Sequence, residues 1–214
     1  MKMTLRLSFL MSFFILMSCQ NKTEEDKKEK STTPEKQEVR KLTENDQLLQ
    51  NLMYAHQTEK FQMKDRVEFM LRLKKEDNET IKTIVKSNTF EVKFPNDSID
   101  KEDELFARLF TLPHNLSYDD DEIELIEQKE IDGVDQDVFK IVKQSDKTLD
   151  LVRIQTQSKT HLIKSITLKD DGQLKKFIYR KYISVSGITI PIQIDYYQGE
   201  ELIQQLSIQR ISFK

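Results

Sequence analysis

The sequence has one cysteine, no tryptophan, four glycines and four prolines in 214 residues. With a single cysteine no intramolecular disulfide can form, so the fold must be stable without covalent cross-links. Basic residues are not in excess, because 34 lysines and arginines stand against 37 acidic residues and give a net charge of −3. This balance argues against a nucleic-acid partner, since proteins that bind nucleic acids usually carry a basic stripe.

The amino-terminal residues combine a short positive region with an apolar run. Lys2 and Arg6 precede the apolar run of residues 7–17, which is shorter than the ~20 residues that a membrane-spanning helix needs. A charged start followed by a run of this length is typical of a secretory signal peptide. We therefore expect residues 1–18 to be a signal peptide.

The only cysteine, Cys19, follows the apolar run in the sequence Leu-Met-Ser-Cys. This resembles the bacterial lipobox, with leucine at the third position before the cysteine and a small residue directly before it. The resemblance implies cleavage between Ser18 and Cys19, a diacylglycerol on the Cys19 thiol and an acyl chain on the new amino terminus. No other cofactor is expected. The alternatives are an ordinary signal peptide with a chance cysteine, or a retained membrane anchor.

Residues 19–41 have almost no apolar side chains and mix both charge signs. Such a segment cannot bury a core, so it predicts a disordered charged tether before a folded domain of residues 42–214. Gln20 stands where an aspartate would favour inner-membrane retention in enteric bacteria, so we expect the outer membrane rather than the inner. The acidic residues 24–26 resemble signals that carry some lipoproteins to the cell surface.

Apolar periodicity divides residues 42–214 into two helices and about ten strands. Helical spacing follows the capping residue Thr43 as far as His56, and recurs over residues 102–112 before Pro113. Elsewhere apolar and polar residues alternate, and all four glycines fall between strands. Short connections require antiparallel pairing, so the pattern predicts an α+β fold built on a long β-meander. The predicted strands are 67–73, 81–87, 90–94, 122–130, 137–143, 148–156, 162–169, 174–185, 188–197 and 202–213.

Two irregularities stand out in the late strands. Pro191 cannot donate to a strand ladder, so it predicts a sheet edge or a strand start. Leu206 and Ile208 share one face of the last strand, whereas Ile211 and Phe213 share the other. A β-bulge near Gln209 would reconcile the two faces.

The order of elements resembles bacterial envelope lipoproteins that are related to the lipoprotein carrier and receptor proteins of the Lol system. The resemblance rests on NLMYAHQTEKF, TLPHNL, IEQKEIDGVDQDVFKIV, SKTHLIKSI and the closing YRKYISVSGITIPIQIDYYQGEELIQQLSIQRISF. It implies a strongly curved, incomplete antiparallel barrel of about ten strands with two helices packed on the concave side. Gln57 departs from the expected glycine, and no tryptophan follows it. The carrier proteins share no diagnostic catalytic residues, so none is assigned here.

The resemblance also implies an apolar concave face that accepts acyl chains or an acylated peptide. The expected partners are a membrane, through the lipid anchor, and a lipid or lipoprotein ligand. The alternative is a structural or protein-interaction module of the outer membrane or cell surface, whose interior is filled by its own helices. A cavity of ~300 Å³ or more would favour a ligand. The predicted ligand-binding residues are Val67, Phe69, Leu71, Leu73, Ile190, Ile192 and Ile194. The aromatic residues that either line a cavity or pack as core are Phe177, Tyr179, Tyr182, Tyr196 and Tyr197.

Catalytic and metal motifs are lacking. His56, His114 and His161 lie on different elements, and no two have metal-ligand spacing. We expect His56 beside the core and His161 in a hydrogen-bonded turn. The acidic run 119–124 lacks the spaced oxygen ligands and the glycine of an EF-hand, so a solvated loop is expected. Without a nucleophile elbow or a phosphate loop, the sequence predicts a protein that is not an enzyme and has no metal site.

Overall fold

Ten antiparallel strands form one open sheet in the computed structural model, which describes residues 42–73, 80–94, 100–117, 119–145 and 147–214. Neighbouring strands follow the order β3-β2-β1-β10-β9-β8-β7-β6-β5-β4, and within the described residues β3 and β4 do not pair to close a barrel. This confirms the predicted α+β fold with an incomplete barrel. The strands are β1 (Arg66–Leu73), β2 (Thr80–Lys86), β3 (Val92–Lys93), β4 (Glu122–Ile131), β5 (Val134–Lys143), β6 (Asp150–Gln157), β7 (Ile163–Asp170), β8 (Gln173–Val185), β9 (Ile188–Gln198) and β10 (Glu201–Phe213).

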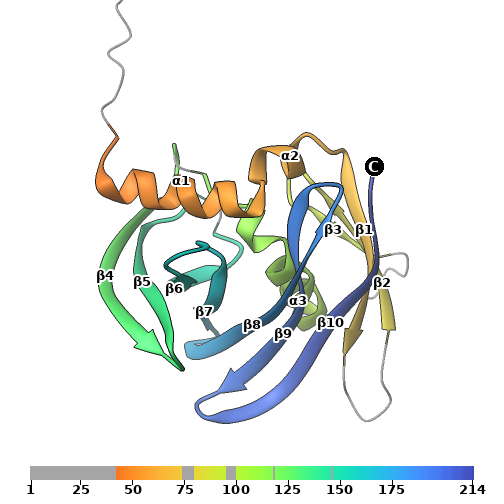
Figure 1. Ribbon diagram of the computed structural model, residues 1–214. Coiled ribbons are helices and arrows are strands. Elements are labelled where there is room, and N and C mark those ends of the chain that lie inside the picture. The colour runs from red at the N-terminus through yellow and green to blue at the C-terminus, as the bar shows by residue number, and fades with distance from the viewer. Residues whose placement is uncertain (1–41, 74–79, 95–99, 118, 146) are drawn as a thin grey trace, which may run out of the picture. The chain divides into compact units, whose positions relative to one another are not determined.

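The helices lie on the inner side of the curved sheet (Figure 1). Helix α3 (Lys101–Thr111) joins β3 at one edge of the sheet to β4 at the other, and it contacts β9 on the way. Helix α1 (Glu44–His56) contacts both β4 and β9, which are not neighbours in the sheet, so α1 bridges the curve. No helix among the described residues is long and apolar enough to cross a membrane.

Local sequence signals explain where α1 begins and ends. The Thr43 hydroxyl accepts a hydrogen bond from the Asp46 N–H at 3.1 Å, and the Asp46 carboxylate accepts one from the Thr43 N–H at 2.8 Å. This reciprocal capping box satisfies two N–H groups at the start of the helix. At the other end Gln57 has a left-handed backbone, with φ of 58°.

Two short segments were not predicted. Helix α2 (Thr58–Gln62) follows Gln57 directly, and the 3₁₀ segment η1 (Leu112–His114) follows α3. Each is about one turn long, so neither shows the apolar periodicity by which helices are recognised in a sequence. The two longer helices are confirmed close to their predicted bounds.

Glycine turns set the strand pairing. Asp132 and Gly133 have φ of 53° and 73° between β4 and β5, and Ser186 and Gly187 have φ of 53° and 73° between β8 and β9. Positive φ at both central residues is the signature of the type I′ turn, whose twist matches that of the flanking strands. The glycine positions therefore predicted these hairpins correctly.

The two predicted irregularities have different outcomes. Glu68 and Met70 of β1 pair with Ser212 and Gln209 of β10, so β10 has one extra residue between these two pairs. Arg210, which lies there, has φ of 52°. Both observations confirm a bulge near Gln209. Pro191 lies in β9, an interior strand, so the prediction of an edge strand was wrong. Pairing of β9 with β10 ends at Gln193 opposite Ser207, however, and Pro191 lies beyond that last pair. The proline is thus tolerated because this end of β9 is unpaired on the β10 side.

Candidate functional site

The seven predicted ligand-binding residues lie on β1 and β9, and six of them are buried. On β1 the inward-facing residues alternate with more exposed neighbours, as predicted. Ile192 is only partly buried because β9 has a register shift there, between Pro191 and Gln193. The six buried members are Val67, Phe69, Leu71, Leu73, Ile190 and Ile194.

The helices cover this face and share one hydrophobic core with it. Helix side chains fill the concave side in this structure. Four surface grooves lie among the described residues, and none of the seven predicted ligand-binding residues lines any of these four. Their role as a ligand surface therefore stays a prediction that requires the helices to move. The helix residues in this core are Leu49 and Leu52 of α1, Phe61 of α2, and Phe106, Leu109 and Phe110 of α3.

A groove beside α3 reaches the hydrophobic core. It has a volume of about 660 Å³ and lies between α3 and the ends of β6, β7 and β8. Its apolar lining consists of Leu105, which is half-buried, with Leu149 and Leu168, which belong to the core. Charged side chains surround this floor. The groove was not predicted, because its walls come from elements that are distant in the sequence. The charged lining residues are Asp100, Lys101, Glu102, Glu104, Arg108, Asp150, Lys169, Asp170, Asp171 and Lys175.

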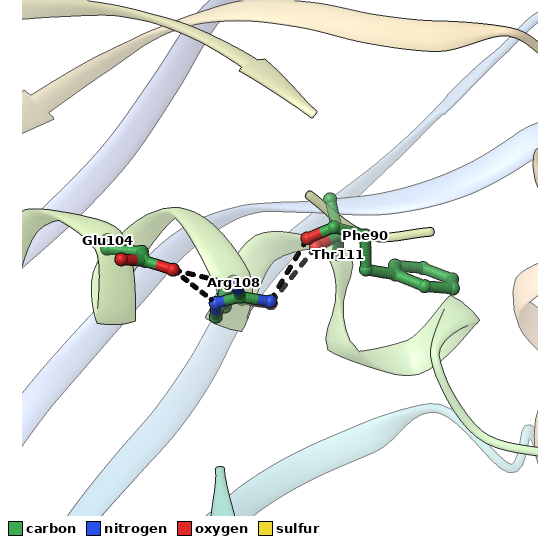
Figure 2. Close-up of polar contacts among 4 residues, drawn as sticks. All are labelled: Phe90, Glu104, Arg108 and Thr111. Carbon is green, nitrogen blue, oxygen red and sulfur yellow. Dashed lines mark hydrogen bonds and ion pairs between the residues drawn. The ribbon is translucent and has the colours of Figure 1, made fainter. Parts of the chain in front are cut away.

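Arg108 fixes the wall of this α3 groove (Figure 2). Its Nε and Nη2 donate to the Glu104 carboxylate at 3.0 and 2.7 Å, and its Nη1 donates to the Phe90 carbonyl at 3.0 Å. The guanidinium therefore ties α3 to the segment between β2 and β3. On the opposite wall Lys175 pairs with Asp170 at 2.6 Å.

Four of the five aromatic candidates pack inside the protein. The rings of Phe177 and Tyr196 stack with centroids 4.9 Å apart, and those of Tyr179 and Tyr182 stack at 6.1 Å. Burial raises the pKa of both Tyr179 and Tyr182, so both hydroxyls remain protonated donors at neutral pH. Tyr197 instead lies half-exposed and accepts a hydrogen bond from Arg180. These contacts favour the core alternative over a cavity lining.

Two of the three histidines meet in the core, which their sequence spacing did not predict. The rings of His56 and His114 are edge to face with centroids 6.1 Å apart, and neither side chain is exposed to solvent. His56 Nε2 accepts a hydrogen bond of 3.4 Å from the Ile163 N–H. The other three ring nitrogens lack a well-aligned partner among the described residues. His161 lies in a turn, where its N–H donates to the Gln157 carbonyl at 2.7 Å, as expected.

Burial keeps the paired imidazoles neutral. It lowers the pKa of His56 to about 4, and the Thr189 backbone opposes this shift only in part. The pKa of His114 is lowered well below its usual range, first by burial and then by the charge that His56 would carry. Neither ring contacts a carboxylate in the described part of the chain, and these residues contain no cluster of three metal-ligating side chains.

The acidic run is only partly solvated. Asp119 and Asp120 are exposed, but Asp121 is buried and residues 122–124 belong to β4, so the expectation of a solvated loop was wrong for residues 121–124. The Asp121 carboxylate accepts hydrogen bonds from the Ser117 N–H at 2.7 Å and from the Ser145 N–H and hydroxyl at 2.7 and 2.8 Å. Asp121 thus joins the loop before β4 to the loop after β5. Cys19, Ser18 and the tether lie outside the described residues.

Comparison with known proteins bears on the fold. No family sequence profile and no curated protein matches the chain. A LolA superfamily protein from Nitrosomonas europaea superposes with a TM-score of 0.56 and 13% identity, over 81% of this chain and 94% of that one. A DUF1329 family protein from Desulfovibrio piger has a TM-score of 0.44 and 11% identity, over 80% and 94% of the two chains. A Vibrio parahaemolyticus protein described as an outer membrane lipoprotein-sorting domain has a TM-score of 0.44 and 9% identity, over 78% and 93%. The chain has a LolA-like fold.

Proposed function

We propose that the protein is a lipid-anchored lipoprotein of the bacterial envelope that binds a hydrophobic ligand and catalyses no reaction. The ligand is a lipid or the acylated end of another lipoprotein. One observation carries the proposal: helices cover an apolar concave sheet face, and Leu149 and Leu168 in the groove beside α3 belong to the same core as that face. Burial of acyl chain on this face is worth ~25 cal/mol for each Å² removed from water.

The α3 groove is the proposed path to the interior. Its volume of 660 Å³ is within the range of small-molecule sites. Leu149 and Leu168 at its floor belong to the same core as the concave face, so an acyl chain that displaced Leu105 would meet apolar side chains throughout. The charged residues around the groove suit a polar headgroup that stays at the surface.

The anchor and compartment rest on the sequence. Cys19 and its lipobox-like context support lipidation, and Gln20 supports the outer membrane over the inner. A chain with two or three acyl groups stays on its membrane, whereas a single acyl chain binds only reversibly. The likeness to a LolA superfamily structure supports a role with lipids or lipoproteins in the envelope.

The packed interior favours a second candidate function. Leu49, Leu52, Leu109 and the other helix residues already occupy the concave side, which fits a structural or protein-interaction module with no ligand. In that case the helices would stay in place, and the exposed surface would carry the function.

Photo-crosslinking separates the two candidates. The full chain is placed in nanodiscs that contain a phosphatidylcholine with a photoactivatable acyl chain, and adducts on β1 and β9 are quantified. We expect labelling of both strands, and Leu105→Asn in the α3 groove should reduce it severalfold. Leu174→Asn is the matched control, because Leu174 is 59% exposed and lies outside the groove. Absence of adducts on both strands would support the module instead.

A further inference from the structure

The His56–His114 pair lies where α1, α2 and η1 meet the sheet. His56 is the last residue of α1, and His114 is the last residue of η1. The ring of His114 stacks on Phe61 of α2, with centroids 4.1 Å apart and planes within 2°. The ring of His56 lies 5.4 Å from that of Tyr182 on β8 and accepts the hydrogen bond from Ile163 of β7. The two imidazoles therefore fasten α1, α2 and η1 to strands β7 and β8.

Further hydrogen bonds join the helical segments to one another. The Thr58 hydroxyl of α2 donates to the Pro113 carbonyl at 3.2 Å, and the Gln62 amide donates to the His114 carbonyl at 3.2 Å. Helices α1 and α2 are also continuous through Gln57. Loss of the histidine contacts would therefore affect the helical segments together.

Histidine is an unexpected residue type for this position. Three of the four ring nitrogens have no aligned partner among the described residues, and unsatisfied buried polar groups are rare because they cost stability. Phenylalanine at 114 could make the same stack on Phe61 without that cost. What an imidazole adds is a proton-binding site close to neutral pH.

Among the described residues, no carboxylate lies beside the rings to stabilise a protonated imidazole. The titratable groups that contact the rings are the partner imidazole and the Tyr182 phenol, which itself stacks on Tyr179. From α2 the rings meet Phe61, and from β7 and β9 they meet backbone groups of Ile163 and Thr189. No described carboxylate is in hydrogen-bond or ring contact with either imidazole. A protonated ring must therefore reach water, which requires that the helices leave the sheet.

We propose that the His56–His114 pair is an acid-sensitive latch that holds α1 and α2 on the sheet at neutral pH and releases them on protonation. Release would uncover the concave face, because α1 and α2 both contact β9, which carries Ile190 and Ile194. Burial lowers the pKa of both histidines, so the closed latch is stable at pH 7.5 and loses stability progressively as the pH falls below the ordinary histidine value of ~6.5. Only the consequence for ligand access rests on the proposed function.

Hydrogen exchange tests the latch without any ligand. The full chain in nanodiscs is exchanged at pH 7.5 and 5.0, with exchange times scaled for the intrinsic rate of amide exchange. We expect the amides of α1 and α2 to lose at least ~10-fold protection at pH 5.0, whereas those of β8 and β9 away from the latch keep theirs. His114→Phe, which preserves the stack on Phe61 but removes one of the two proton-binding groups, should reduce this loss. His56→Gln is a second variant whose amide oxygen can still accept from Ile163.

The control is His161→Asn, since His161 lies in a turn with φ of 56° that asparagine tolerates. It should behave as the unchanged chain does. Equal loss of protection in the unchanged chain and in both latch variants would overturn the latch, as would protection of α1 and α2 that does not depend on pH.

A lipid measurement separates this inference from the proposed function. In the same nanodiscs, labelling of β1 and β9 by the photoactivatable phosphatidylcholine should rise severalfold at pH 5.0, and His114→Phe should reduce the rise. The headgroup keeps its charge between these pH values, so the lipid itself does not titrate. If labelling of β1 and β9 is the same at both pH values and in both variants, the latch is overturned, but ligand binding is still supported. Acid-induced opening without labelling at either pH would support the latch and overturn the proposed ligand.

Discussion

The Tyr179 hydroxyl of β8 donates a hydrogen bond of 2.8 Å to the carbonyl oxygen of Leu109 in α3. In a regular helix that carbonyl would accept from the N–H four residues later, but the residue there is Pro113, which has no N–H. Tyr179 therefore satisfies a carbonyl that the proline leaves without its usual donor. The same bond fixes the carboxyl end of α3 on the concave face of the sheet.

Replacing Tyr179 with phenylalanine should destabilise the protein by about 1–3 kcal/mol, because the Leu109 carbonyl is left unsatisfied in the core. Urea unfolding measures this change. Tyr197→Phe is the matched control, since its hydroxyl accepts from Arg180 on a half-exposed surface, and it should cost less than about 0.5 kcal/mol. Equal costs for the two substitutions would show that Tyr179 does not fix α3.

Arg108 gives a second prediction, on the wall of the α3 groove. Lysine cannot reproduce a guanidinium that binds Glu104 through two nitrogens and the Phe90 carbonyl through a third (Figure 2). Arg108→Lys should therefore cost about 1–3 kcal/mol of stability and raise proteolytic cleavage near Phe90. Arg153→Lys on the exposed side of β6 is the control. Unchanged cleavage in the Arg108 variant would contradict the assigned role.

Stability should fall as the pH drops from about 6.5 to 4. The folded-state pKa of His56 is about 4, below its value of 6.5 in the unfolded chain, so the unfolded state binds the proton first. The stabilising contribution is complete above pH 6.5 and is lost on the way down to pH 4, by about 3 kcal/mol for His56 alone. His114 acts in the same direction.

Urea midpoints at pH 7.5, 6.0, 5.0 and 4.5 check this prediction. The unchanged chain should lose more stability across this range than His114→Phe or His56→Gln, because each variant lacks one of the two groups. Since the variants share all other titratable groups, the difference isolates the histidines. Parallel pH profiles would mean that neither imidazole is held neutral by burial.

The strands were predictable because each depends on local alternation. In β1 the burial of Val67, Phe69, Leu71 and Leu73 follows the alternation of the sequence directly. Turn chemistry was equally local, since Asp-Gly and Ser-Gly pairs adopt positive φ wherever they occur between strands. Together these signals predicted ten antiparallel strands without any knowledge of tertiary contacts.

Features that depend on distant contacts were missed. Nothing near His56 indicates that His114 will face it, because the two meet only after α3 has crossed the sheet. Asp121 likewise is buried because of Ser145 on another loop, and a run of acidic residues gives no sign of that partner. Helix α2 begins after a glutamine with positive φ, a conformation that sequence analysis assigns first to glycine or asparagine.

Lipidation at Cys19 has a direct test. Cys19→Ser removes the thiol that would carry diacylglycerol, so the protein should no longer incorporate labelled palmitate or sediment as a mature protein with membranes. Ser12→Ala, in the apolar run before it, is the control and should leave both properties unchanged. Full palmitate incorporation in the Cys19 variant would refute the predicted anchor.

Residue-level mapping of photo-crosslinked lipid tests whether the concave face binds acyl chains. We predict adducts on the inward-facing Phe69 and Leu71 of β1 and Ile194 of β9. Glu68 and Arg72, which alternate with the two β1 residues and face outward, should carry none. Adducts confined to outward-facing residues, or spread equally over both faces of β1, would contradict this prediction.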